Sequence, residues 1–238
     1  MVFVQLKDLM RRRYRLPSPL DPFENKVSSQ FGEDGIIAAI FQAIPPRSRY
    51  FVEFGIGPAW HSAYEHGLEG NCVQLRVDGW DGLMMDAGEH PAIFDVRNEF
   101  ITHENINDVL KRYLVPRNLD VLSIDVDGQD LWIWKNLQYY ATLVVIEYNG
   151  HIPATDSVSV PIAPDFKWDG TQYYGASLRA LDKIANQKGY RLVFANGVNS
   201  FFVLEKLLAN PEDFKFEQIF RPAANHGPDL LKRPLVTI

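Results

Sequence analysis

Two patterns of apolar residues alternate along most of the chain. Short aliphatic and aromatic runs without a helical period predict strands, and apolar residues spaced three and four positions apart predict helices. The predicted strands cover residues 49–54, 80–86, 94–101, 120–128, 142–146, 190–195 and 200–204. The predicted helices cover residues 33–44, 71–77, 109–114, 129–140 and 176–187.

The order of these elements predicts the fold class. Helices and strands that alternate about five times favour a mostly parallel sheet with helices on both faces. The last two strands are joined by Asn196-Gly197-Val198-Asn199, a turn-forming sequence typical of an antiparallel hairpin. We therefore expect an α/β fold with a Rossmann-like, doubly wound, mostly parallel sheet and a C-terminal antiparallel hairpin.

No internal repeat or low-complexity segment interrupts this pattern, so we expect one domain over residues 1–238. Residues 1–27 form an N-terminal extension in which Arg11-Arg12-Arg13 is interpreted as a solvated helix face or arm, with contact to a phosphate or a membrane surface as a less favoured alternative. Residues 151–175 form a long irregular segment that contains three prolines and several aromatic residues. Because long loops inside compact domains are usually functional, this segment is predicted to be a lid over an acceptor site.

Composition narrows the function classes. The chain has 46% hydrophobic and 23% charged residues and a formal net charge of −6, which is typical of a soluble protein and argues against nucleic-acid binding. Its one cysteine excludes an internal disulfide framework. No apolar run approaches the ~20 residues that span a bilayer, and we expect a cytoplasmic protein without a membrane span. The sequence leaves homo-oligomer formation open.

Acidic residues stand at or just beyond the ends of several predicted strands. They are Glu53, Asp86, Asp125, Asp127 and Glu147. In an open α/β sheet the carboxyl ends of parallel strands share one edge, where ligands bind, so these carboxylates are expected to converge there. Single acids at strand ends often have structural roles instead. Asp86 is then a turn residue, and Asp125 or Asp127 caps the following helix.

Four motifs carry a family resemblance. They are Ser29-Gln30-Phe31-Gly32-Glu33-Asp34, Val52-Glu53-Phe54-Gly55-x-Gly57, Trp80-x-Gly82-Leu83-x-x-Asp86 and Ile124-Asp125-Val126-Asp127-Gly128. Together they resemble the class I S-adenosylmethionine-dependent methyltransferases, and most closely the FkbM-type O-methyltransferases. The resemblance extends from Ser28 to Leu204. It departs from the family pattern at Pro58-Ala59, where a third small residue is expected.

The resemblance implies a role for each matching residue. Glu53, Gly55 and Gly57 line the methionine part of S-adenosyl-L-methionine, Asp86 holds the ribose hydroxyls, and Glu104 and Asn105 flank the adenine. Asp125 and Glu147, with Asn149 or His151 as a further ligand, hold a metal ion. Oxygen ligands suit Mg²⁺ or Mn²⁺. Asp127 is the candidate general base, and Asp125 and His151 complete the predicted catalytic set.

We therefore expect an S-adenosylmethionine-dependent O-methyltransferase that acts on a hydroxyl group of a sugar or glycan, with divalent metal assistance. One alternative is a non-catalytic nucleotide-binding or scaffold protein on the same fold, which the departure at Pro58-Ala59 favours. Another is an NAD-dependent oxidoreductase. It is favoured less, because the first loop lacks the full G-x-G-x-x-G pattern.

Overall fold

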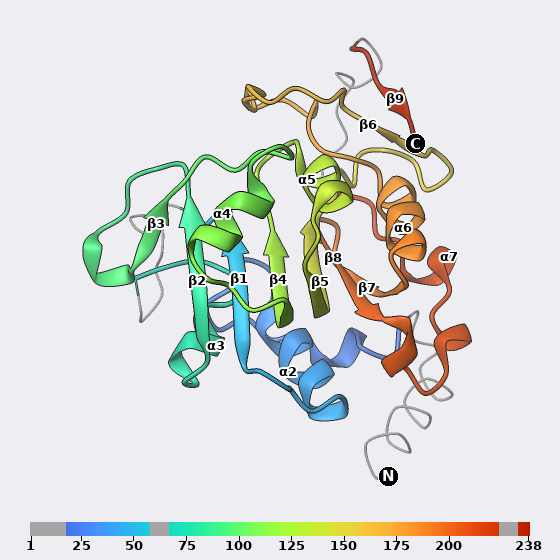
Figure 1. The fold of residues 1–238 in the computed structure, drawn as a ribbon. Coiled ribbons are helices and arrows are strands. Elements are labelled where there is room, and N and C mark those ends of the chain that lie inside the picture. Colours follow the sequence, from blue (N-terminus) through green and yellow to red (C-terminus); the bar gives the residue numbers. More distant parts are fainter. Residues whose placement is uncertain (1–17, 58–66, 224–232) are drawn as a thin grey trace.

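The computed structural model describes residues 18–57, 67–223 and 233–238 (Figure 1). Most of the N-terminal extension, including Arg11-Arg12-Arg13, lies outside the described residues. The same holds for Pro58 and Ala59, where the sequence departs from the family pattern. Within the described residues, no helix is both long and apolar enough to cross a membrane.

A sheet of seven strands forms the centre of the molecule, in the order β3-β2-β1-β4-β5-β8-β7. The strands are β1 (Tyr50–Phe54), β2 (Asp81–Asp86), β3 (Val96–Asn98), β4 (Asn118–Ile124), β5 (Tyr140–Glu147), β7 (Tyr190–Ala195) and β8 (Asn199–Leu204). The first five strands pair in parallel. Strand β8 runs antiparallel to both of its neighbours, β5 and β7. The structure thus confirms a mostly parallel α/β sheet with a C-terminal hairpin.

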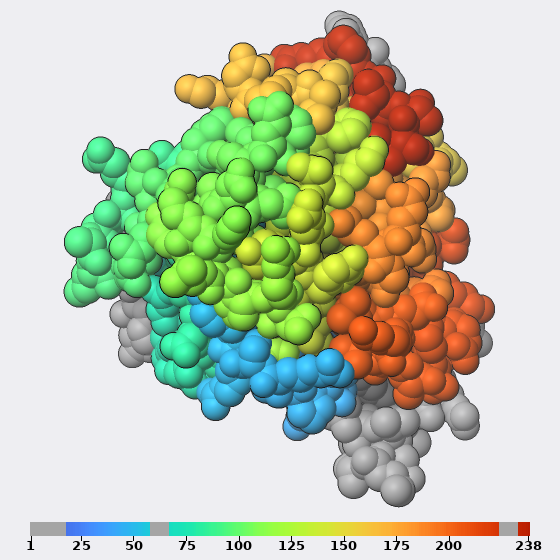
Figure 2. All heavy atoms as spheres, viewed as in Figure 1, coloured from blue at the N-terminus to red at the C-terminus, as the bar shows by residue number. Residues whose placement is uncertain are grey.

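Helices cover both faces of this sheet. They are α2 (Glu33–Ala43), α3 (Val73–Val77), α4 (Ile106–Arg112), α5 (Asp130–Asn136), α6 (Leu178–Gln187) and α7 (Phe216–Ile219). One core contains buried residues of α4, α5, α6 and α7, and the other contains buried residues of α2 and α3. Successive residues of β4 point into opposite cores, with Val121 on the α2 side and Leu122 on the α5 side. Figure 2 shows α4, α5 and α6 covering the near face.

Short elements complete the described chain. Single-turn 3₁₀ helices span Asp21–Phe23, Ala92–Phe94, Glu205–Leu207 and Pro211–Asp213. The short strands β6 (Val158–Ser159) and β9 (Val236–Thr237) pair antiparallel in a separate sheet. Neither this small sheet nor α7 was predicted. A strand of two residues is too short to show the alternation of apolar and polar residues by which strands are recognised in a sequence. Such a strand forms only because it pairs with its partner strand.

The structure moves two predicted strand ends. Strand β4 ends at Ile124, so Asp125 to Gly128 form a loop at the carboxyl edge and not the end of the strand. Strand β3 ends at Asn98, well before Glu104. The predicted third strand was too long because Phe100 and Ile101 continue the apolar run after pairing with β2 has ended.

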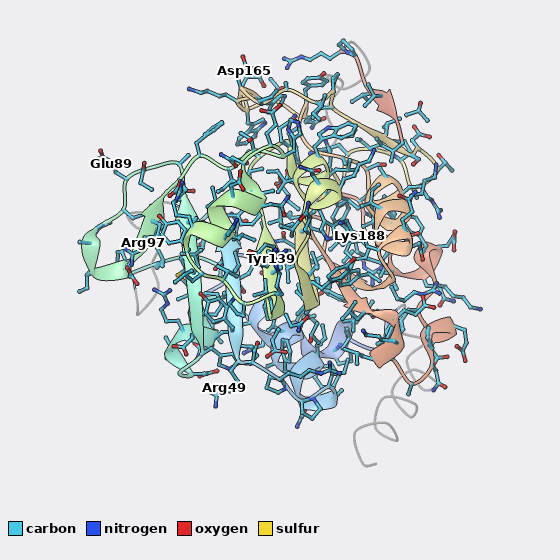
Figure 3. All side chains as sticks on the ribbon, viewed as in Figure 1. Arg49, Glu89, Arg97, Tyr139, Asp165 and Lys188 are labelled. Carbon is cyan, nitrogen blue, oxygen red and sulfur yellow. The ribbon has the colours of Figure 1, made fainter. Side chains whose placement is uncertain are left out.

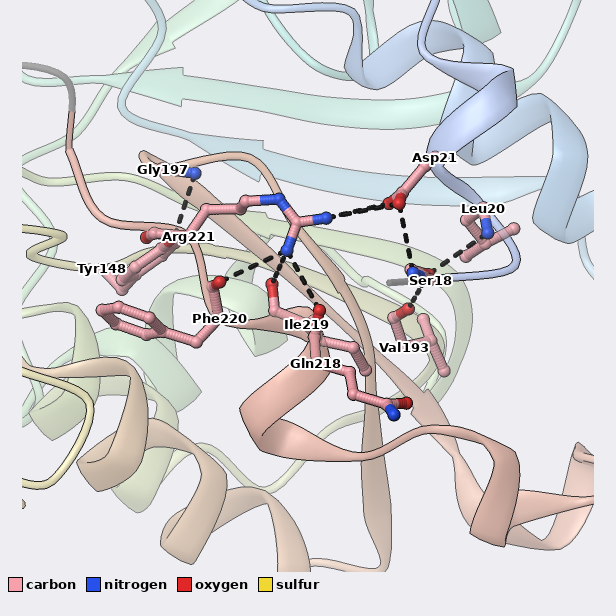
Figure 4. A network of polar contacts seen from close by, with 10 residues as sticks. All are labelled: Ser18, Leu20, Asp21, Tyr148, Val193, Gly197, Gln218, Ile219, Phe220 and Arg221. Carbon is pink, nitrogen blue, oxygen red and sulfur yellow. Dashed lines mark hydrogen bonds and ion pairs between the residues drawn. The ribbon is translucent and has the colours of Figure 1, made fainter. Parts of the chain in front are cut away.

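Arg221 connects three distant parts of the chain (Figure 4). Its guanidinium forms an ion pair with Asp21 at 3.2 Å, and its Nη1 donates to three backbone carbonyl groups at the end of α7. The hydroxyl of Tyr148 donates to the carbonyl of Arg221 and accepts the N–H of Gly197 at 2.9 Å. This network fixes the residue that directly follows Glu147.

Candidate active site

Two adjoining cavities lie at the carboxyl edge of the parallel strands. The large cavity has a volume of about 680 Å³ and the small cavity about 130 Å³. Gly55, Asp86, Asp125 and Asp127 line both. From β1 the strand order runs outward through β2 and β3 on one side, and it continues from β4 on the other side of β1. The crevice between the carboxyl ends of β1 and β4 is therefore the topological switch point, where ligands usually bind in such folds. The combined volume lies within the range of small-molecule sites.

The turn after β1 brings two backbones into contact. Gly55 has a φ of 83°, and a Cβ atom placed on it would lie 1.1 Å from the carbonyl oxygen of Asp125. The N–H of Asp125 in turn donates to the carbonyl of Phe54 at 3.1 Å. Gly57 is different, because a Cβ atom there would make only ordinary contacts at 3.8 Å or more. Of the two motif glycines, only Gly55 is required by the packing.

Glu53 is buried beneath the large cavity and anchors the approach to α3. Its carboxylate accepts the N–H of Asn71 at 2.6 Å and the N–H of Cys72 at 3.0 Å. Burial raises the pKa of Glu53 to about 7, although these hydrogen bonds favour the charged form. Both oxygens are therefore engaged by the backbone. A contact between Glu53 and the methionine part of the cofactor, as predicted, would therefore be made by the surface of the side chain that lines the large cavity.

Asp86 stands on the rim between the two cavities, at the end of β2. Its Oδ1 accepts the N–H of Gly88 at 2.6 Å. One oxygen of Asp86 thus holds a turn, as the alternative prediction for this residue states. His90 Nε2 lies 3.3 Å from the same oxygen. The side chain of His90 is only 3% exposed and lines the large cavity. His90 was not predicted from the sequence, where its four-residue spacing from Asp86 is the one signal.

The loop after β4 is organised by Asp130, which was not among the predicted site residues. Asp130 is the first residue of α5, and its carboxylate accepts the N–H of Val126 at 2.8 Å and of Gly128 at 3.0 Å. Asp127 is held with a φ of 56°, a left-handed conformation uncommon for residues other than glycine. The loop is thus shaped by Asp130, and the residue at the helix N-cap is Gln129.

Three carboxyl groups meet at this edge. One oxygen each of Asp125, Asp130 and Glu147 lie within 4.8 Å of one another. The Oε2 atom of Glu147 is buried and has no hydrogen-bond partner among the described residues. Burial, reinforced by the neighbouring acids, raises the pKa of Asp125 and Glu147 well above the ordinary range, and burial raises the pKa of Asp130 to about 6. Such an oxygen cluster fits a hard divalent cation.

Asn149 and His151 lie outside this cluster. The amide of Asn149 donates to the carbonyl oxygens of Gln172 and Tyr174, both at 2.8 Å, and its Oδ1 accepts the N–H of His151. The ring of His151 packs edge-on against Tyr174. Neither residue lines either cavity. The structure places both in the loop after β5. Asp130, which lines neither cavity, is the residue whose carboxylate lies beside those of Asp125 and Glu147.

Glu104 and Asn105 also lie away from the cavities. Asn105 precedes α4, and its side chain is bonded to the backbone of Thr102 and Phe100. Glu104 lies beside His103, with an exposed side chain. The small cavity is lined by earlier residues of the same segment, among them Phe100 and Ile101. The two residues predicted to flank adenine lie beyond the cavity lining, because the end of β3 was predicted too late in the chain.

The predicted lid crosses above the carboxyl ends of β1, β4 and β5, where Figure 1 shows it in gold. Phe166 lines the small cavity and Trp168 the large one. The ring of Phe166 packs over Gly128, where a Cβ atom would lie 2.3 Å from it. Trp168 stacks edge-on with Tyr174 at 6.0 Å and remains 47% exposed. The segment thus supplies an aromatic wall to both cavities.

These residues form a site with an apolar slot, a carboxylate on its rim and a buried acidic cluster beside an exposed acid, Asp127. Such an arrangement can hold a nucleoside, bind a divalent cation and remove a proton. No protein-family model matches the chain, and no match is found among curated proteins or solved structures.

Proposed function

We propose that the chain is an S-adenosylmethionine-dependent O-methyltransferase that acts on a sugar or glycan hydroxyl with the help of Mg²⁺ or Mn²⁺. The sheet supports the proposal, because its parallel strands and closing hairpin agree with the class I methyltransferase fold that the motifs imply. The observation that carries it is the position of Asp86 on the rim shared by the two cavities. An acid at the end of the second strand is placed to accept hydrogen bonds from a ribose diol.

The residues around Asp86 fit an adenosyl group. Gly88 and His90 both contact Oδ1 of Asp86, which leaves Oδ2 for a ribose hydroxyl. On one side the small cavity offers Phe100 and Phe166 as apolar surfaces for adenine. On the other side the large cavity passes Gly55 and Gly57, where the methionine part would lie. The bound cofactor supplies the electrophilic methyl group.

The acidic residues fit the acceptor end of the reaction. Asp125, Asp130 and Glu147 would hold the cation, since they present carboxylate oxygens close together. When bound, a dication lowers the pKa of an acceptor hydroxyl. Asp127 is exposed at the cavity and receives the hydroxyl proton. Although part of Asp127 is exposed, partial desolvation by the surrounding loop and the neighbouring charge of Asp86 raise the pKa of Asp127, which brings it toward the range useful to a general base.

Asp86→Ala tests the donor site. The variant should bind S-adenosylmethionine more weakly by about 1–3 kcal/mol, through loss of a hydrogen-bonded ribose partner, as measured by titration calorimetry. Asp81→Ala is the matched control, because Asp81 is an exposed acid at the opposite end of the same strand. The control should bind as the wild type does.

The same calorimetry decides between the alternatives. If the wild-type protein binds neither S-adenosylmethionine nor its demethylated product, the proposal is wrong. Binding of NAD in their place would favour an oxidoreductase. Tight binding of the adenosyl compounds without turnover of any acceptor would favour a non-catalytic binding protein.

Asp127→Asn tests the base. Asparagine tolerates the left-handed conformation of this position, so the loop should keep its shape. We expect kcat to fall by roughly 10²–10⁴-fold, the usual contribution of a general base, while the Kd for the donor is unchanged. Asp156→Asn, a change at an exposed acid outside both cavities, is the control. Wild-type kcat in Asp127→Asn would place the base elsewhere.

A further inference from the structure

Acidic residues dominate the ionisable lining of the large cavity. Its described lining contains seven acidic residues and no lysine or arginine. They are Glu53, Glu69, Asp86, Glu89, Asp125, Asp127 and Glu147. Figure 3 shows Glu89 on the loop after β2, whereas the labelled Lys188 lies near β7. A bound dication offsets the charge of Asp125 and Glu147, and the other acids of the lining remain. An anionic acceptor would therefore enter against repulsion that water screens weakly in a recessed site.

The floor of the large cavity offers two buried side-chain oxygens, of which that of Glu147 belongs to the proposed cation site and that of Asn199 remains as a hydrogen-bond acceptor. Glu147 and Asn199 face each other across the β5–β8 pair and line the cavity together. Glu147 Oε2 and Asn199 Oδ1 are both buried and have no hydrogen-bond partner among the described residues. Asn199 is 3% exposed and Glu147 is 8% exposed. Buried acceptors of this kind are satisfied by hydroxyl or ammonium donors, or by a cation.

The orientation of the Asn199 amide follows from its other contact. Its Nδ2 donates to Glu33 Oε1 at 3.0 Å, and a carboxylate oxygen can only accept. Glu33 also accepts from Asn196 Nδ2 at 2.7 Å, which fixes its carboxylate against the hairpin turn. The oxygen of Asn199 is therefore the atom left for the cavity. The Ser29–Asp34 motif thus supports the acceptor side of the site through Glu33.

The outer wall of the cavity presents an aromatic surface. Trp168 is 47% exposed, and its Nε1 is held by the carbonyl of Thr171 at 2.5 Å. The indole therefore has its polar atom engaged and its ring available. The C–H face of a pyranose ring packs well on such a surface, and its hydroxyls would remain directed at the acidic wall and floor.

We infer that the acceptor is a carbohydrate without an anionic group, either a neutral or an amino sugar, and that uronic acids and phosphosugars are excluded. The inference rests on the proposed function and adds the substrate class to it. The side-chain oxygen of Asn199 on the floor, unpaired among the described residues, requires a donor, the acidic wall repels anions, and the exposed indole favours a sugar ring.

Matched acceptors test the inference. Methyl glucoside, its 2-amino derivative, its uronate and its 6-phosphate differ mainly in charge, as do the corresponding galactose and mannose series. With labelled S-adenosylmethionine and Mn²⁺, we expect kcat/KM for the neutral or amino member to exceed that for both anionic members by at least about 10-fold, corresponding to about 1.4 kcal/mol. The neutral and amino members distinguish hydroxyl recognition from ammonium recognition.

Glu89→Lys provides a second readout. Glu89 is exposed on its loop, so the variant should fold, and the new cation should raise relative kcat/KM for the anionic acceptors by several-fold. Glu212→Lys, an exposed change away from the cavities, should leave this ratio unchanged.

The possible results separate the inference from the proposed function. A preference for the anionic members would overturn the inference, as would an unchanged ratio in Glu89→Lys. Failure to methylate every member of all three series, in protein that binds the donor, would also overturn it. Failure to bind the donor at all would instead overturn the proposed function.

Discussion

Gly55→Ala is expected to destabilise the protein by more than about 4 kcal/mol, or to prevent folding altogether, because the added methyl group meets a backbone atom. The clash is with the carbonyl oxygen of Asp125, which lies 1.1 Å from the position that Cβ would take. That oxygen belongs to a loop tied down by the Asp130 carboxylate and by a hydrogen bond to Phe54. Relief of the clash would separate β1 from the start of the loop after β4. This movement would also distort both cavities, because Gly55 and Asp125 line both of them.

Two other glycines separate the clash from the cost of backbone conformation. Gly79 has a φ of 78°, close to that of Gly55, but no atom lies within 4 Å of its Cβ position. Gly79→Ala should therefore cost only about 1–2 kcal/mol, the penalty of a left-handed conformation. Gly57→Ala should cost less than Gly55→Ala, since its contacts are ordinary. Urea unfolding measures all three, and equal losses in Gly55→Ala and Gly79→Ala would contradict the packing argument.

Glu147→Gln is expected to stabilise the metal-free protein and to lose most of the stabilisation that a bound metal ion gives. Without metal, the substitution removes one of three clustered carboxyl groups, two of which are buried, and should stabilise the protein by about 1–3 kcal/mol. For a chain of this size, each kcal/mol raises Tm by about 2–4 °C. In wild-type protein, Mn²⁺ at 100 times its Kd should add about 2.7 kcal/mol. The variant should lose most of that gain.

The pH dependence follows from the raised pKa values. A carboxyl group whose pKa is raised by folding holds its proton in the folded state after the unfolded chain has lost it. The unfolding free energy therefore falls as pH rises, from 3.8 to about 6 for Asp130 and from 4.5 upward for Glu147. Glu147→Gln should flatten this decline. Stabilisation by Mn²⁺ should grow with pH, because the metal binds the deprotonated groups.

Thermal unfolding between pH 5 and 8, with Mn²⁺ or with a chelator, measures both effects. Glu212→Gln is a suitable control, since Glu212 is an exposed acid outside the cluster, and it should follow the wild-type curve. An equal Mn²⁺ response in Glu147→Gln and wild type would remove Glu147 from the metal site. A loss of stability in the metal-free variant would show that the carboxyl group is stabilised by its surroundings and not strained by them.

Local patterns predicted the fold because its elements are strongly apolar and their order is regular. The run from Leu119 to Ile124 is buried on both faces, and the Asn-Gly turn at 196–197 marks the hairpin. Strand ends were harder to place. Phe100 and Ile101 look like a continuation of β3, but they turn away from the sheet to line the small cavity. The two-residue strand β6 has no sequence period and depends on pairing with β9.

The candidate-site residues that strand order brings to the carboxyl edge could be predicted from the sequence. Those that reach it through hydrogen bonds and packing within loops could not. Parallel strands bring Asp86, Asp125 and Glu147 to one edge whatever the loops do, so these residues follow from strand order. Asp130 and His90 depend on how two short loops fold back, which residue spacing alone does not determine. Asn149 was predicted as a ligand from its place after a strand. An amide there serves equally well to hold a loop, and in the structure it donates to two carbonyl groups.

The left-handed backbone of Asp127 has an evolutionary consequence. Glycine adopts this conformation without strain, so mutation to glycine would make the protein more stable by about 1 kcal/mol while it removed the proposed base. Stability and chemistry therefore select in opposite directions at this position. Among homologous chains, an aspartate kept here would mark lineages under selection for turnover, and a glycine would mark lineages that retain only the fold.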